Sequence, residues 1–188
     1  MWDPCHHAGV TDRLAKGANI AVAVPAVRVV LEWQTGPQVA DVDISALLLG
    51  ASGRVDADHD FVFYNQPVHP SGAVRHEGKQ VGPWSYDALR VELARVPAER
   101  VVIAAPVDSG TFGQVPGLRL RLIDVGSGAE LVQVDLTDVR SETALVCGEF
   151  YRRAGAWKFR AVGQGYDAGL AGLARDFGIR VGDLPPVC

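Results

Sequence analysis

The segment TALVCGEFYRRAGAWKFRAV, residues 143–162, decides the fold class of this chain. Two runs rich in Val, Leu and aromatic residues, 143–151 and 157–162, are separated by Ala154-Gly155. Apolar and polar residues alternate along parts of both runs, and a period of two is typical of a β-strand with one buried face. A short loop containing glycine between two such runs indicates a β-hairpin. The segment therefore predicts two neighbouring antiparallel strands.

Strands of the same kind are expected along most of the chain. They cover residues 27–33, 39–49, 61–64, 89–93, 101–107, 118–125, 131–135, 143–151 and 157–162. Clusters of Gly, Pro, Asp and Ser between them are typical of turns, and Gly126-Ser127-Gly128 is expected to close a second hairpin.

One segment predicts an α-helix. Residues 169–177 place apolar side chains at helical spacing on one face, and Gly178 directly afterwards is typical of a helix end. Short strands at roughly ten-residue spacing with one late helix indicate an all-β fold. We expect a two-sheet antiparallel β-sandwich with one short C-terminal helix.

Composition and charge limit the domain count and the function classes. The chain has 188 residues, of which 48% are hydrophobic and 21% charged, which suits one domain with a substantial core. A formal net charge of -4 argues against a dedicated nucleic-acid-binding protein. No apolar stretch approaches the ~20 residues of a membrane helix, so membrane insertion is not expected. We expect an N-terminal tail or lead-in strand at 1–14, the sandwich domain at 15–183 and a C-terminal tail at 184–188.

The cysteines and the first residues indicate the compartment. Cys5, Cys147 and Cys188 are odd in number, widely spaced and form no CxxC pair, so a disulfide framework is not expected. The start of the chain lacks the basic and apolar regions of a signal peptide. These features favour a cytoplasmic location.

Aspartates gather around one apolar run of the sequence. Asp41 and Asp43 are two residues apart at the start of an expected strand, so they should share a face. Asp58 and Asp60 flank the start of the next strand, FVFYN, which ends in Asn65. Clustered carboxylates repel one another, and a hard divalent cation bound through oxygen lowers that cost. The residues leave two alternatives open: a Ca²⁺ site, or a solvated acidic rim without an ion.

Other candidate motifs give little support for catalysis. Residues 163–169, GQGYDAG, resemble a dinucleotide-binding loop, but too few residues follow for a βαβ unit, so a tight glycine turn is expected. Cys5-His6-His7 is either a transition-metal ligand set or a tail. His59, His69 and His76 form no HxH or HxxxH pattern. No serine–base pair or distinctive pair of acids appears, so no enzyme is expected.

Basic residues gather late in the chain. Arg119 and Arg121 alternate on one expected strand. The hairpin between 152 and 160 carries four more basic side chains: Arg152, Arg153, Lys158 and Arg160. The alternatives are a solvated sheet face and a docking face for an acidic partner.

Several blocks of the sequence resemble the TerD family, the tellurium-resistance and stress-response proteins of bacteria. The blocks are KGANI (16–20), DVDISALLLG (41–50), DHDFVFYNQP (58–67), FGQV (112–115), ETALVCGEFYRR (142–153) and AWKFRAVGQGYDAGLAGLARDFGI (156–179). The resemblance covers about residues 14–181. It implies a two-sheet β-sandwich, Ca²⁺ binding by acidic loops at one end, no known enzymatic activity and a cytoplasmic role. It also implies partners among the other proteins of the resistance cluster, some of them at the inner face of the membrane.

Carried over to this chain, the resemblance implies five metal ligands. They are Asp41, Asp43, Asp58, Asp60 and Asn65. Two later stretches depart from the family pattern. Where the family has a Gly-Asp-Asn turn this chain reads Gly78-Lys79-Gln80, and in place of an acidic run it has residues 84–87, WSYD, which leave Asp87 with Glu77 nearby.

Two functional hypotheses follow from these residues. The first is a non-enzymatic stress and tellurium-resistance adaptor that binds Ca²⁺ weakly through the aspartate cluster. The second is a metal-independent protein–protein interaction scaffold that has lost the calcium site. Calcium affinity depends on the number of charged ligands, and Lys79 within reach of the aspartates would oppose the ion directly.

Overall fold

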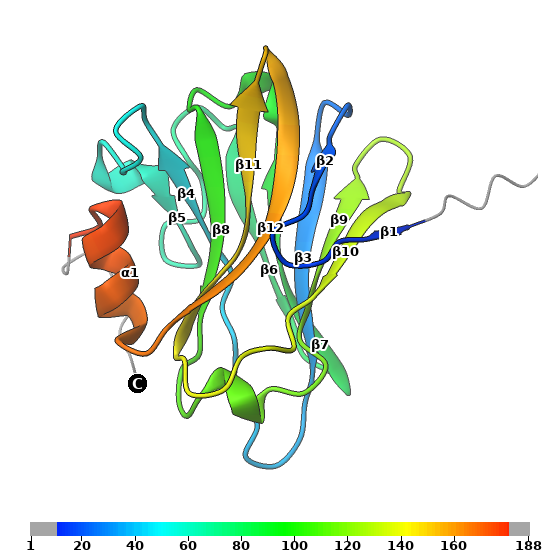
Figure 1. The fold of residues 1–188 in the computed structure, drawn as a ribbon, viewed down its shortest axis with the longest axis vertical. Coiled ribbons are helices and arrows are strands. Elements are labelled where there is room, and N and C mark those ends of the chain that lie inside the picture. The colour runs from blue at the N-terminus through cyan, green and yellow to red at the C-terminus, as the bar shows by residue number, and fades with distance from the viewer. Residues whose placement is uncertain (1–10, 181–188) are drawn as a thin grey trace, which may run out of the picture.

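Two six-stranded β-sheets pack face to face, as the sequence predicts, and one helix lies against the outside of one of them (Figure 1). The computed structural model describes residues 11–180. The expectations for Cys5, His6, His7, Cys188 and the tail at 184–188 lie outside the described residues.

The first sheet contains the strands that later position Lys79 and Asp87. Its order is β1 (Asp12–Arg13), β10 (Glu130–Asp135), β9 (Arg119–Asp124), β3 (Val27–Gln34), β7 (Trp84–Val91) and β6 (Val74–Gln80). Only the short lead-in strand β1 pairs in parallel, with β10, and the other pairings of this sheet are antiparallel. β6 therefore forms one edge of the sheet.

The second sheet contains the hairpin that opened the sequence analysis. Its order is β2 (Asn19–Ala21), β12 (Ala156–Tyr166), β11 (Ala144–Arg153), β8 (Arg100–Pro106), β4 (Ser45–Leu49) and β5 (Phe61–Val62). Neighbouring strands are antiparallel, and Phe150 of β11 lies opposite Phe159 of β12. Three 3₁₀ turns complete the described elements: η1 (Asp58–Asp60), η2 (Leu93–Arg95) and η3 (Phe112–Gln114).

Two apolar clusters account for the layers. The larger lies between the sheets and includes Leu31, Leu89 and Phe150. The smaller lies between the second sheet and the helix α1 (Gly169–Phe177), where Leu47 of β4 meets Leu173. Because β4 is covered on both faces, all five of its residues are buried, which explains its uninterrupted apolar run.

The sequence predictions hold for most elements, with several corrections. The strand expected at 39–49 begins only at Ser45, and the strand expected at 89–93 begins at Trp84 and ends at Val91. The helix has the predicted bounds, and Gly178 ends it with φ +76°. The expected glycine turn at 163–169 is wrong in part, because β12 continues through Gly165 to Tyr166 and the chain turns only afterwards. β2 and β6 were not predicted. No helix among residues 11–180 is long and apolar enough to cross a membrane.

Candidate functional site

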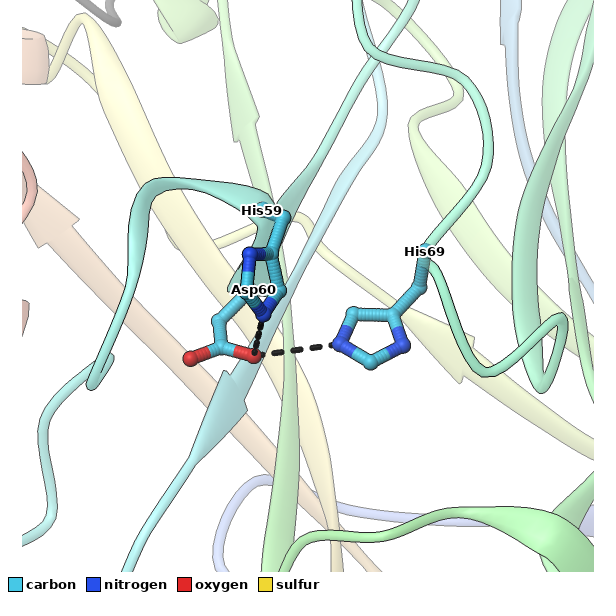
Figure 2. A group of neighbouring side chains, drawn as sticks. All are labelled: His59, Asp60 and His69. Atoms are coloured by element: carbon cyan, nitrogen blue, oxygen red, sulfur yellow. Dashed lines mark hydrogen bonds and ion pairs between the residues drawn. The ribbon is translucent and has the colours of Figure 1, made fainter.

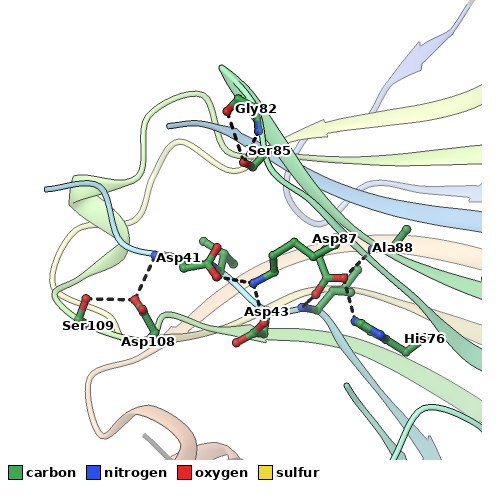
Figure 3. A network of polar contacts seen from close by, with 12 residues as sticks. Asp41, Asp43, His76, Gly82, Ser85, Asp87, Ala88, Asp108 and Ser109 are labelled. Atoms are coloured by element: carbon green, nitrogen blue, oxygen red, sulfur yellow. Dashed lines mark hydrogen bonds and ion pairs between the residues drawn. The ribbon is translucent and has the colours of Figure 1, made fainter. Parts of the chain in front are cut away.

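The segment that carries Asp41 and Asp43 runs beside the end of β8. The N–H of Asp43 donates to the carbonyl of Pro106 at 3.2 Å, and Val42 forms a bridge with Val107. The intervening Val42 is fully buried. The alternation of the extended chain therefore puts both carboxylates on one side, as predicted (Figure 3).

Lys79 reaches this aspartate pair from the opposite sheet. Its Nζ lies 2.6 Å from Asp41 Oδ2 and 2.7 Å from Asp43 Oδ1, and it stands 5.7 Å from the centroid of the Trp33 ring. The lysine side chain is 19% exposed. Burial lowers the pKa of Lys79, but the hydrogen bonds to Asp41 and Asp43 outweigh it, so the pKa is raised above its usual 10.5. The ammonium is therefore charged at neutral pH and shared between two carboxylates.

Asp87, the acid left from the altered run, is engaged elsewhere. It is fully buried on the core face of β7. Its Oδ2 accepts the N–H of Ile44 at 2.9 Å and its Oδ1 accepts that of Ala88 at 3.0 Å. His76 Nε2 lies 2.8 Å from Asp87 Oδ1, close enough for an ion pair but not aligned as a hydrogen bond (Figure 3). The contacts of the Asp87 carboxylate are therefore all with interior groups, and it does not face the Asp41–Asp43 pair.

The donor set around Asp41 and Asp43 does not fit Ca²⁺ as arranged. Ca²⁺ takes six to eight oxygen ligands, whereas here an ammonium occupies the space between the two carboxylates. Glu77, the other acid considered from the sequence, is paired with Arg28 at 2.6 Å. Asp108 Oδ1 accepts the N–H of Asp41 at 3.0 Å and so stands next to the pair.

Asp58 and Asp60 lie toward the other end of β4 from Asp43. Asp43 precedes β4, whereas Phe61 pairs with Leu47 in the middle of the strand, and the antiparallel register places the preceding Asp60 on the side of Leu48 and Leu49. The exposed Asp58 faces Arg180 at 3.6 Å. Asn65 is exposed in the turn closed by the bridge between residues 63 and 66. The structure therefore does not gather the five predicted residues at one point, and calcium binding by them stays a prediction.

Asp60 instead lies against two histidines that sequence reasoning did not connect with it. His59, Asp60 and His69 each place one ligand atom within 4.8 Å of the others (Figure 2). His69 comes from the turn after β5, ten residues from His59, so their spacing matches no metal-binding pattern. His59 and Asp60 are adjacent in the sequence, but no sequence signal connects them with His69, which only tertiary folding brings beside them.

Three of the six basic residues singled out from the sequence, Arg119, Arg121 and Arg160, are paired with glutamates. Arg119 and Arg121 both contact Glu32 on the adjacent strand. Arg100 and Arg160 both contact the buried Glu149. The alternating arginines of β9 thus belong to a cross-strand charge network on the outer face of the first sheet.

Comparison with known proteins agrees with this fold over nearly the whole chain. The TerD domain model matches residues 11–177. The chain is 38% identical to tellurium resistance protein TerD of Serratia marcescens over 88% of this chain and 96% of the relative. It is 36% identical to general stress protein 16U of Bacillus subtilis, covering 92% of this chain and 100% of the relative. A crystal structure of the unknown function protein SAV2460 superposes with a TM-score of 0.68 at 25% identity, over 84% of this chain and 98% of that one. The chain therefore belongs to the TerD family.

Proposed function

We propose that this TerD-family protein serves a bacterial stress or tellurium-resistance response as a non-enzymatic, cytoplasmic interaction module. In this proposal the positive charge of Lys79 replaces calcium at Asp41 and Asp43. The names of the relatives, a tellurium resistance protein and a general stress protein, support the kind of response. The observation that carries the proposal is the position of Lys79 Nζ, 2.6 and 2.7 Å from the two carboxylates.

The electrostatic repulsion between Lys79 and a bound calcium ion supports a metal-independent site. An ion on the same two carboxylates would stand about 4 Å from the ammonium, where a +1 and a +2 charge repel by about 8 kcal/mol at an effective dielectric constant of about 20. Binding in the micromolar to millimolar range supplies only about 4–8 kcal/mol. Calcium would therefore have to displace Lys79, at the loss of both of its ion pairs.

Calcium titration of the chelator-stripped chain tests the proposal, with Mg²⁺ as the control ion. We expect no saturable heat at this site in the natural protein. Lys79→Asp replaces the opposing charge with a further carboxylate, so we expect it to gain saturable Ca²⁺ binding and a higher melting temperature with the ion. Adding Asp43→Asn to that variant should remove the gained binding.

A calcium-binding adaptor, the first hypothesis from the sequence, makes the opposite prediction. Asp41, Asp43 and the neighbouring Asp108 keep three carboxyl groups close together. If the natural protein binds Ca²⁺ saturably and Asp43→Asn abolishes that binding, Lys79 yields to the ion and the metal-independent proposal is wrong.

An interaction module also needs a face for its partners. An open cavity of about 550 Å³ lies at the hairpin where β11 ends and β12 begins. Its lining includes Glu99, Glu149 and four arginines, of which Arg100 and Arg160 pair with Glu149, so within residues 11–180 Arg152 and Arg153 supply its unpaired positive charge. Arg152 is stacked 4.7 Å from the Trp157 ring centroid, which holds one guanidinium at this face. We propose that acidic surfaces of other proteins of the resistance cluster, some at the inner face of the membrane, dock here.

A further inference from the structure

We infer that His59, Asp60 and His69 form a binding site for a transition-metal ion of the Zn²⁺ type. This site differs from the Asp41–Asp43 pair in place and in chemistry. Imidazole nitrogen favours zinc-like ions, whereas Ca²⁺ takes oxygen ligands. The inference goes beyond the proposed function and does not depend on it.

The distances suit a small tetrahedral ion. His69 Nε2 lies 3.1 Å and His59 Nε2 lies 3.9 Å from the same oxygen, Asp60 Oδ1. Ligand atoms bound to zinc at about 2.0–2.2 Å stand about 3.3–3.6 Å apart in a tetrahedron, between these two values. The imidazole rings meet edge-on, at 64° with centroids 5.4 Å apart, and Figure 2 shows both rings directed at one carboxylate oxygen. A small rotation of His59 completes the set.

Two of the three ligands are held in place before any ion arrives. Asp60 Oδ2 accepts the backbone N–H groups of Asp56 at 3.1 Å and Ala57 at 2.9 Å, so Oδ1 stays turned toward the histidines. His69 is buried, and its Nδ1 lies 2.7 Å from Ser71 Oγ. In this structure Nδ1 also accepts the backbone N–H of Ser71 at 3.1 Å. When Nε2 binds a metal, Nδ1 carries the ring proton and donates a hydrogen bond to the Ser71 hydroxyl instead, an outer contact that metal-bound histidines commonly make.

The third ligand leaves the site open to solvent. The His59 side chain is 53% exposed, against 16% for Asp60 and 6% for His69. An ion can therefore enter from the His59 side, and a water molecule can complete three protein ligands to four. In the absence of an ion, the contact between His69 and Asp60 serves as an ordinary interior hydrogen bond.

Zinc titration of the full chain tests this site once the other candidate ligands are removed. Cys5, His6 and His7 form a second potential ligand set, so the background is Cys5→Ser/His6→Asn/His7→Asn. In that background we expect one Zn²⁺ per chain by calorimetry, a raised melting temperature with the ion, and visible absorption bands when Co²⁺ replaces Zn²⁺.

His59→Asn is the decisive variant, because an exposed side chain can be changed without disturbing the fold. We expect it to weaken Zn²⁺ binding by at least about tenfold. Asp56→Asn is the matched control and should leave the affinity unchanged, because its exposed side chain lies just before the same 3₁₀ turn and the substitution keeps its backbone N–H. Unchanged affinity in His59→Asn, equal weakening in both variants, or no binding in the background would overturn the site. None of these outcomes depends on the calcium result at Asp43.

Discussion

At the level of single residues, burial makes the thiol of Cys147 unreactive. The side chain is fully buried in β11, and burial raises the pKa of its thiol to about 12 from the usual 9.0. The thiolate is the nucleophile. At pH 8 the fraction of Cys147 present as thiolate is roughly a thousandfold smaller than for a thiol with the usual pKa. We predict that iodoacetamide labels Cys147 in denaturant but not in the folded protein on the same time scale, as measured by peptide mapping. Equal labelling rates in both states would show that this strand opens readily.

Single residues of the candidate sites differ in how far the sequence predicts them. Lys79 was predicted to lie within reach of the aspartates, because it replaces an acid in a turn that the resemblance places there, and the ion pairs confirm this. Asp87 was considered as an ion ligand, but strand alternation on β7 turns it into the core. His59 and His69 carry no signal at all, because their meeting depends on how the chain reverses after β5.

At the level of elements, the sequence predicts interior strands better than edge strands. β4 and β8 are covered on both sides and read as apolar runs. β6 lies at the edge of the first sheet and is largely polar, with only Val74 fully buried. Apolar and polar residues do not alternate clearly along β6, because few positions of an edge strand contact the core and need an apolar side chain.

Gly148 on β11 offers a test at this level. It follows an irregularity in the pairing with both neighbouring strands. A Cβ there would lie 2.9 Å from the carbonyl oxygen of Arg160, a backbone atom that cannot turn aside. We predict that Gly148→Ala lowers the free energy of unfolding by about 1–3 kcal/mol in urea titrations. Gly36→Ala is the control, since its Cβ would meet Val39 at an ordinary 3.5 Å, and an equal loss in both variants would refute the argument.

Across the whole molecule, the two sheets are joined by the apolar core and by polar ties near one end. Lys79 on β6 of the first sheet reaches Asp41 and Asp43 beside the second, and Asp87 on β7 accepts the N–H of Ile44 just before β4. The sandwich itself was predictable from alternation and turn spacing. These ties were not, because they depend on which strands face each other across the core.

The buried tie should matter far more to the joining of the sheets than the exposed one. Asp87→Ala leaves the N–H groups of Ile44 and Ala88 without their acceptor and removes the carboxylate beside His76 Nε2, so we predict a loss of about 3–5 kcal/mol in the free energy of unfolding. Asp41→Ala removes a half-exposed partner of Lys79 and should cost about 1 kcal/mol or less. Asp87→Asn keeps a carbonyl oxygen that can accept the N–H of Ile44, so its loss in the free energy of unfolding should lie between those of the two alanine variants. Urea titration gives the three values, and amide exchange at Ile44 shows whether the sheets separate locally. If Asp87→Ala is no less stable than Asp41→Ala, the apolar core alone holds the two sheets together.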